Sequence, residues 1–219
     1  LAFDMGGTTA KAVIGNDGVF PIATESEVAR VYRFKRGSGL PLLVPVMDMI
    51  EVGAGGGSIA HLNEMGLPTV GPESAGSDPG PVCYGQGGSE PTVTDADLVL
   101  GLLDPDYFLG GEMQLDRTAS ATAITKALAE PLGITVEEAA WGIHEIVTGN
   151  MAQAAAIHAI EKGLNVEKFT MVPIGGAGPV HSGVFARELG VSKVIVPQRE
   201  TASVWCAFGA AAADVLHVH

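Results

Sequence analysis

The segment that most restricts the fold is a strand, a glycine-rich turn, a helix and a second strand in direct succession. Residues 169–174 are apolar enough for a buried strand, and a glycine-rich turn follows at residues 175–178. Pro179 suits the start of a helix that continues over residues 180–189, and residues 193–197 supply the next strand. This order predicts a right-handed βαβ unit with its turn at the carboxyl edge of a parallel sheet, where ligands of open α/β sheets bind.

A second glycine-rich stretch lies near the start of the chain, where residues 3–11 read Phe-Asp-Met-Gly-Gly-Thr-Thr-Ala-Lys. Apolar residues on both sides predict two antiparallel strands with glycines and hydroxyl groups at the tip. Glycine N–H groups can approach an oxyanion closely, threonine hydroxyls add donors, and a carboxylate can hold hydrated Mg²⁺ beside a phosphate. The candidate residues for this role are Asp4, Gly6, Gly7, Thr8 and Thr9. A hairpin whose glycines only suit the turn is the alternative.

The composition limits the partners of this chain. With 12 Lys and Arg against 25 Asp and Glu, the 219 residues have a formal net charge of −13, which argues against binding to nucleic acid or to an anionic membrane. Phosphate recognition must therefore come mainly from backbone donors. Cys83 and Cys206 form no disulfide framework or Cys-x-x-Cys motif, which favours reduced thiols in a cytoplasmic protein. No apolar run reaches the roughly 18 residues that a membrane-spanning helix needs.

Residues 53–91 are the least regular part of the sequence, because they are rich in glycine and proline. A long structureless stretch inside a compact domain is uncommon unless it is functional or disordered, and the apolar residues here argue against disorder. We therefore expect an ordered, Gly/Pro-rich loop insertion, about residues 51–115, close to the nucleotide or substrate. A metal site could be built from His61, Glu73, Asp78 and Cys83. Ordinary loop hydrogen bonds are favoured over it, since the spacing matches no zinc pattern.

Helical periodicity dominates the second half of the chain. An alanine-rich helix is predicted over residues 118–130. Thr135 and Glu138 form a capping box that opens a long helix ending near Lys162. The small residues of 203–218 predict a last helix that can pack closely against another helix.

Two aspartates and three histidines invite a functional interpretation. Asp95 and Asp97 would point in different directions on a helix, so paired-carboxylate catalysis is not indicated and helix capping is expected for one of them. His144 and His158 are about four turns apart on the long helix, roughly 21 Å, so they cannot share a metal, and each is expected to be half-buried. His181 follows the glycine-rich turn, where contact with a base or ribose and packing beneath the turn both remain open.

These motifs resemble those of a known superfamily. Asp-x-Gly-Gly-Thr at residues 4–8 and Gly-Gly-Ala-Gly-Pro at residues 175–179 are similar to the second phosphate motif and the adenosine motif of the actin, Hsp70 and sugar-kinase superfamily. The stretches at residues 52–60, 71–85 and 92–101 resemble the hydantoinase A, 5-oxoprolinase and acetone carboxylase family. The resemblance covers essentially the whole chain.

The resemblance implies that residues 1–219 are an α/β domain, the second actin-like (ribonuclease H-like) ATPase domain of a longer chain, with a mixed sheet flanked by helices. ATP and Mg²⁺ are the implied cofactors. Asp4, Thr8 and Thr9 are the implied catalytic residues, and Asp4 would hold the metal. The implied nucleotide-binding residues are Gly6, Gly7, Lys11, Gly175, Gly176, Ala177, Gly178 and His181. Many members of the family carry Asp where this chain has Lys11, which disfavours a metal role at that position and suggests a phosphate contact.

The resemblance also implies an enzyme that uses ATP to activate a substrate carbonyl by phosphorylation. Opening of a cyclic amide, of the hydantoin or 5-oxoproline type, is the main interpretation, and carboxylation of a ketone is the alternative. A non-catalytic actin- or Hsp70-like module that responds to nucleotide is the alternative from another class. Residues 53–91 favour the enzyme, because they match the amidase and carboxylase family. An amino-terminal actin-like domain is expected outside this chain, which alone would be inactive, and we expect a hetero- or homo-oligomer.

Overall fold

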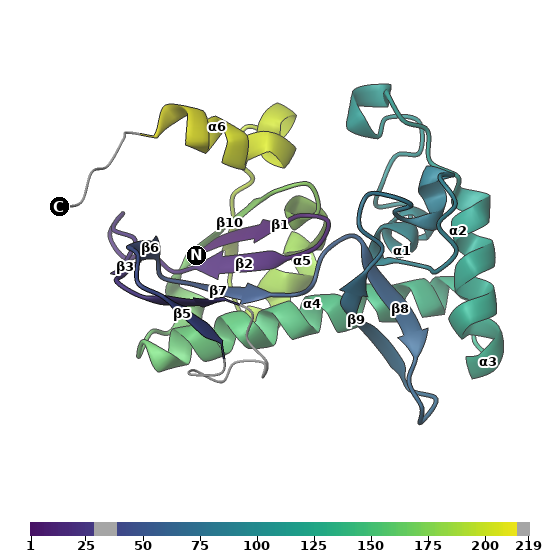
Figure 1. Cartoon of the computed structure of the whole chain (residues 1–219), viewed down its shortest axis with the longest axis horizontal. Coiled ribbons are helices and arrows are strands. Elements are labelled where there is room, and N and C mark those ends of the chain that lie inside the picture. The colour runs from purple at the N-terminus through teal and green to yellow at the C-terminus, as the bar shows by residue number, and fades with distance from the viewer. Residues whose placement is uncertain (29–38, 214–219) are drawn as a thin grey trace.

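The computed structural model describes residues 1–28 and 39–213, which form two lobes that share one long helix (Figure 1). The first lobe is built on a five-stranded sheet, and the second on a β-hairpin with several short helices. Helix α4 (Val136–Glu161) packs against elements of both lobes. Among the described residues, no helix combines the length and the apolar character that crossing a membrane requires.

The main sheet has the strand order β11-β10-β1-β2-β7. At its centre, β1 (Ala2–Met5) pairs in parallel with β10 (Thr170–Ile174) and antiparallel with β2 (Ala10–Val13). The outer strands are β11 (Lys193–Val194), parallel to β10, and β7 (Met49–Val52), antiparallel to β2. The α/β class, the mixed sheet and the βαβ unit are therefore confirmed.

One face of this sheet is covered by α4 and by α5 (Gly178–Leu189). The side chains of β1 alternate between its two faces, as the period of a strand requires. Phe3 points to the helices, and its ring stacks on that of Phe185 with the ring centroids 4.1 Å apart. Met5 is also fully buried, whereas Asp4 is only partly buried. Asp4 is thus directed away from the apolar core.

Two short, two-stranded antiparallel sheets extend the first lobe. In one, β3 (Ile22–Ala23) pairs with β6 (Val46–Met47), and in the other β4 (Ser26–Val28) pairs with β5 (Leu40–Leu42). Residues 40–52 contribute to three separate strands, β5, β6 and β7. Pro45, which cannot donate a hydrogen bond to a sheet, lies in the break between β5 and β6.

The second lobe begins with an antiparallel hairpin of β8 (Ser58–Leu62) and β9 (Pro68–Ser74). The expectation that residues 53–91 lack regular structure is therefore wrong for this part. Ala60 and Val70 are cross-strand partners, and both are buried on the same face of the hairpin. Pairing is maintained although β9 contains Pro68, Gly71 and Pro72, because Pro68 lies at the end of the strand and the other two lie where the register shifts.

Short helices complete the second lobe and the end of the chain. Helix α2 (Arg117–Ile124), a π-helical segment (Thr125–Ala129) and α3 (Glu130–Leu132) follow one another and end at Gly133, close to the predicted helix. The remaining helices are η1 (Val82–Tyr84), α1 (Val93–Val99), η2 (Leu109–Gly111), η4 (Val166–Lys168), η5 (Arg199–Val204) and α6 (Trp205–Ala212). Helix α6 is shorter than predicted, and residues 214–219 lie outside the described residues.

Asp95 organises the glycine- and proline-rich part of the second lobe. It is fully buried, and its carboxylate completes a capping box with Thr92 at the start of α1. The same carboxylate accepts hydrogen bonds from the backbone N–H groups of Val82 and Cys83, at 3.1 and 2.8 Å, and from the hydroxyl of Ser120 at 2.7 Å. The capping role expected for one of the two aspartates is confirmed for Asp95.

We expect Asp95→Asn to lower the free energy of unfolding by about 3 kcal/mol, because an amide NH₂ would face donors that now share a carboxylate. Urea denaturation followed by circular dichroism measures this change. Asp106→Asn is the matched control, since Asp106 is exposed in the same lobe and should shift stability by less than about 0.5 kcal/mol. Equal effects of the two substitutions would contradict the role of Asp95.

Candidate functional site

The structure brings the two glycine-rich motifs together at one edge of the main sheet. We call residues 4–11 the phosphate hairpin and residues 175–178 the glycine turn. They meet because β1 and β10 are neighbouring parallel strands, and the N–H of Ala177 donates to the carbonyl of Met5 at 2.9 Å. At Gly175, where φ is +85°, a Cβ atom would overlap the Asp4 carboxylate and lie 2.5 Å from the carbonyl oxygen of Met5. Only glycine allows this approach.

A third segment, residues 53–57, supports the tip of the phosphate hairpin, and we call it the support loop. The N–H of Gly56 donates to the carbonyl of Gly6 at 3.0 Å, and that of Gly57 donates to the carbonyl of Gly7 at 2.6 Å. These bonds engage two carbonyl groups of the tip, whereas Gly7 and Thr8 themselves are exposed. The support loop belongs to the loop-rich segment that was expected to lie near the nucleotide.

Gly55 packs so tightly that its substitution should destabilise the hairpin tip. A Cβ atom there would lie 2.6 Å from backbone atoms of Gly7 and Thr8, which cannot move without shifting the hairpin. We expect Gly55→Ala to lower the free energy of unfolding by about 2 kcal/mol. Gly53→Ala is the control, because no described atom lies within 4 Å of a Cβ at that position. Urea denaturation compares the two variants, and an unchanged midpoint for Gly55→Ala would refute the contact.

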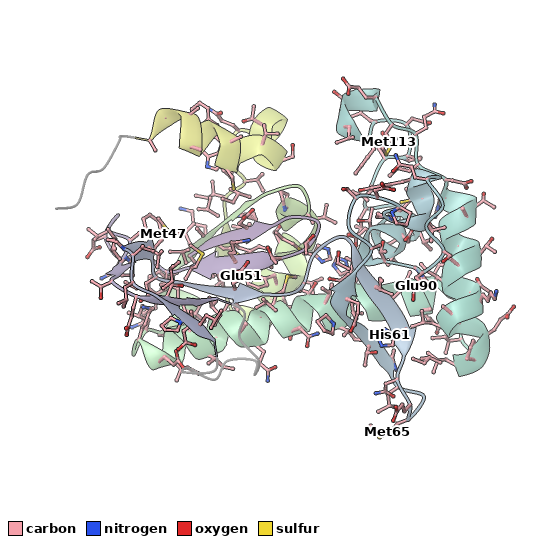
Figure 2. The ribbon with its side chains drawn as sticks, in the orientation of Figure 1. Met47, Glu51, His61, Met65, Glu90 and Met113 are labelled. Atoms are coloured by element: carbon pink, nitrogen blue, oxygen red, sulfur yellow. The ribbon has the colours of Figure 1, made fainter. Side chains whose placement is uncertain are left out.

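Charged side chains form a row across three strands beside the hairpin tip. Asp4 is paired in register with Lys11, and Lys11 with Glu51, which lies on β7 (Figure 2). The ammonium group of Lys11 is 3.4 Å from a carboxylate oxygen of Glu51 and donates to the hydroxyl of Thr9 at 2.6 Å. Lys11 is therefore already held by two neighbours, and its contact with a phosphate stays a prediction.

The first turn of α6 reaches the Asp4 carboxylate. Burial, followed by the negative charge of Asp4 and a hydrogen bond to it, raises the pKa of the Cys206 thiol above its ordinary value. This thiol is therefore protonated at neutral pH and is a poor nucleophile. Asp4 thus lies among Gly175, Cys206 and the hairpin tip, as a single carboxylate with backbone and hydroxyl donors nearby.

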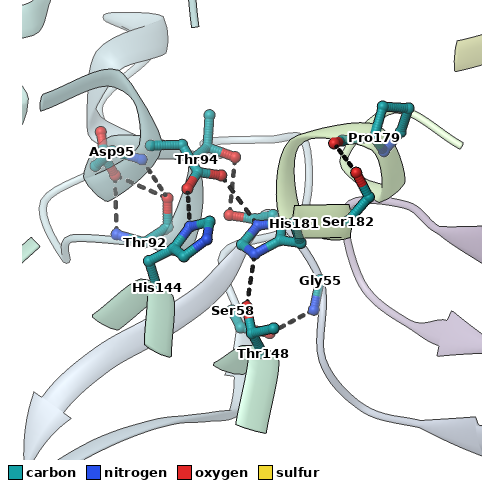
Figure 3. Close-up of polar contacts among 12 residues, drawn as sticks. Gly55, Ser58, Thr92, Thr94, Asp95, His144, Thr148, Pro179, His181 and Ser182 are labelled. Carbon is teal, nitrogen blue, oxygen red and sulfur yellow. Dashed lines mark hydrogen bonds and ion pairs between the residues drawn. The ribbon is translucent and has the colours of Figure 1, made fainter. Parts of the chain in front are cut away.

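A buried cluster lies beneath the glycine turn (Figure 3). It joins Asp97 of α1, His144 of α4 and His181 of α5, all at most 3% exposed in their side chains. Ring atom Nδ1 of His144 is 2.8 Å from Oδ1 of Asp97, and Nε2 of His181 is 3.1 Å from Oδ2. The hydroxyl of Thr148 is 3.0 Å from Nδ1 of His181. We call Asp97, His144 and His181 the buried triad.

The carboxylate of the triad is ionised. Burial raises the pKa of Asp97, but the hydrogen bonds from His144 and His181, followed by electrostatic attraction to the same two residues, outweigh burial, so the pKa lies below its ordinary value. The position of His181 fits packing beneath the turn, because both of its ring nitrogens have partners inside the protein. A contact of this side chain with the base or ribose stays a prediction. His144 and His158 are buried, not half-buried as expected.

The structure does not assemble the metal site considered for the loops. Within residues 1–28 and 39–213, the buried triad is the one group of three potential ligands close enough to share an ion. His61 lies on the β8–β9 hairpin (Figure 2), and Cys83 is buried beside Asp95. Burial, then the charge of Asp95, raises the pKa of the Cys83 thiol far above its ordinary range, so this thiol is protonated at neutral pH.

This chain belongs to the hydantoinase/oxoprolinase family, because the model of that family matches residues 1–219. It is 42% identical over 215 residues to the caprolactamase subunit alpha of Pseudomonas jessenii, covering 98% of this chain and 29% of that protein. It is 45% identical over 177 residues to the acetophenone carboxylase gamma subunit of Aromatoleum aromaticum, covering 80% of this chain and 24% of that subunit.

Solved structures agree with these similarities. An acetone carboxylase in its nucleotide-free state matches 97% of this chain with a TM-score of 0.85 and 36% identity, over 29% of that chain. The ATP-dependent caprolactamase from Pseudomonas jessenii matches 95% of this chain with a TM-score of 0.81 and 42% identity, over 28% of that chain. The chain thus spans less than a third of the length of these relatives.

Proposed function

We propose that this chain is the nucleotide-binding domain of an ATP-dependent enzyme that opens cyclic amides. The observation that carries the proposal is the meeting of the phosphate hairpin and the glycine turn at Asp4, which only glycine at position 175 permits. The similarity to an ATP-dependent caprolactamase supports both the use of ATP and a cyclic amide as substrate.

In this proposal the hairpin side of the site binds the phosphates. Asp4 offers one partly buried carboxylate, which suits a Mg²⁺ ion that keeps most of its water molecules. The exposed backbone of Gly7 and the hydroxyl groups of Thr8 and Thr9 are held in place by the support loop and by Lys11. Donors fixed in advance stabilise developing charge without reorganisation, which is commonly the largest contribution to catalysis.

The glycine turn would seat the adenosine. No described atom lies within 4 Å of a Cβ built at Gly176, which is exposed, so the turn presents open backbone to a ligand. When bound, ATP supplies the phosphoryl group that activates the substrate carbonyl. The residues of this chain orient that group, since phosphoryl transfer depends mainly on positioning and electrostatic stabilisation.

A ketone carboxylase is the second candidate. The 45% identity to the acetophenone carboxylase gamma subunit and the TM-score of 0.85 with an acetone carboxylase favour it. A non-catalytic nucleotide-responsive module is less well supported, because the named relatives are enzyme subunits. The short span relative to these proteins supports a further actin-like domain outside this chain, and their subunit names support an assembly with partner chains. We place this assembly in the cytoplasm, with Cys83 and Cys206 reduced.

Phosphate release by the complete protein and its co-expressed partner subunits tests the proposal. We expect ATP hydrolysis that depends on Mg²⁺ and is stimulated by a lactam, a hydantoin or 5-oxoproline. Stimulation only by a ketone with bicarbonate would identify the carboxylase. ATP binding without stimulation by either substrate class would support the non-catalytic module, and absence of ATP binding would refute the proposal.

A further inference from the structure

We propose that Asp97, His144 and His181 are positioning residues that hold the two sides of the nucleotide site at their working separation. The inference rests on the proposed function, since it concerns the same site. Its structural basis is that α1 is bonded to both sides at once. One connection leads from α1 through the support loop to the phosphate hairpin, and the other leads through the buried triad to the glycine turn.

The first connection consists of backbone and hydroxyl hydrogen bonds. The N–H and the hydroxyl of Thr94, at the start of α1, both donate to the carbonyl of Gly56 at 2.8 Å. Gly56 in turn donates to the carbonyl of Gly6 at the hairpin tip. A displacement of α1 would therefore be passed to the tip through two successive bonds.

The second connection begins one helical turn further along α1, at Asp97. Its carboxylate accepts from Nε2 of His181, which lies in the first turn of α5. Because the carboxylate is ionised, Nε2 must be the donor, and in a neutral ring Nδ1 then accepts from the hydroxyl of Thr148. The backbone N–H of His181 donates to the carbonyl of Ala177 in the glycine turn. His181 therefore connects Asp97, through its ring, to the glycine turn, through its backbone.

His144 fixes the remaining carboxylate oxygen. It donates from Nδ1, and it belongs to α4, the helix that both lobes share. One carboxylate thus joins α1, α4 and α5 in a site that water does not reach, where hydrogen bonds to a charged group are strong and their loss is costly. This connection between the lobes would fix the position of the glycine turn relative to the phosphate hairpin.

A metal ion is the competing occupant of the triad, and the ring geometry disfavours it. The imidazoles of His144 and His181 are stacked, with centroids 4.2 Å apart and an angle of 12° between their planes. Lone pairs lie in the ring planes, so those of two parallel rings run side by side and do not converge on one ion. Each nitrogen instead faces its own oxygen of Asp97. This is the arrangement of two donors on one carboxylate.

The test measures ATP affinity by calorimetry and turnover by phosphate release in the complete protein. We expect His144→Phe and Asp97→Asn to weaken ATP binding about tenfold and to lower turnover about 100-fold, because misplacement by about 1 Å has effects of this size. His144→Asn should restore most of both values, since its amide nitrogen occupies the place of Nδ1. In His144→Phe and Asp97→Asn, amide hydrogen exchange should become faster at residues 175–181. Circular dichroism is expected to show that both variants are still folded.

His158→Phe is the matched control. His158 is a buried histidine on the same helix but lies outside the triad, so its loss should affect stability and leave ATP affinity unchanged. If the wild-type protein binds ATP and the folded triad variants bind it equally well, the positioning role is wrong and the proposed function stands. If the wild-type protein binds no ATP, the positioning role and the proposed function are both wrong. If the wild-type protein retains one equivalent of Zn²⁺ or Mn²⁺ and Asp97→Asn does not, the triad is a metal site and the hydrogen-bonded arrangement proposed here is wrong.

Discussion

Asp4→Asn is expected to lower turnover about 1,000-fold while ATP affinity changes little. Asparagine keeps the shape of the side chain but removes the negative charge that would hold Mg²⁺ beside the phosphates. In the proposed site a bound Mg²⁺ would contribute several kcal/mol of charge stabilisation in the transition state, whereas much of the ground-state binding would come from the glycine turn. The change therefore acts mainly on the chemical step.

Steady-state phosphate release over a range of Mg²⁺ concentrations, together with calorimetry of ATP binding, measures these two effects. Asp17→Asn provides the control, because Asp17 is exposed in a turn at the other end of β2. A variant at Asp4 with wild-type turnover at saturating Mg²⁺ would show that this carboxylate is structural.

Gly176→Val is expected to abolish measurable ATP binding without unfolding the protein. A Cβ at this position meets no described atom within 4 Å, and the backbone is outside the left-handed region, so the fold accepts a side chain. A branched side chain would nevertheless occupy the space in which adenosine would lie on the turn. Valine at the neighbouring Gly175 would not give this information, because it would collide with Asp4 and disturb the sheet edge.

Calorimetry with ATP and a thermal melt separate binding from stability in this variant. Gly183→Val is the control, since Gly183 lies on α5, the helix that follows the glycine turn, is exposed, and also has no described atom within 4 Å of a Cβ. Wild-type affinity in Gly176→Val would mean that the nucleotide does not lie on the glycine turn.

Several elements followed from local patterns, because their stabilising contacts lie close together in the sequence. The capping box of α4 is an example: Thr135 and Glu138 are three residues apart, and their reciprocal hydrogen bonds are present at 2.8 and 3.2 Å. The βαβ unit was predictable for the same reason, since strand, turn, helix and strand follow in order. The βαβ rule then placed the glycine turn at the sheet edge.

Other elements were missed because glycine and proline give a poor local signal. The β8–β9 hairpin lies within the segment that was expected to be irregular, and it is stabilised by burial of Ala60 and Val70 against other parts of the second lobe. The support loop belongs to a segment that was expected near the nucleotide, but its hydrogen bonds to the phosphate hairpin were not predicted. Glycine is required at position 55 because a Cβ atom there would lie 2.6 Å from backbone atoms of Gly7 and Thr8, which are remote in sequence.

The sequence by itself determined the α/β class, the two glycine-rich motifs and the family, because each depends on residues that lie near one another in the chain. Only the tertiary structure decided that Asp4 meets Gly175 and that Asp97 joins His144 and His181. The two histidines are 47 and 84 positions from Asp97 along the chain. No periodicity or spacing rule relates residues on three different helices. Their meeting depends on how α1, α4 and α5 pack, which is set by the burial of the whole core.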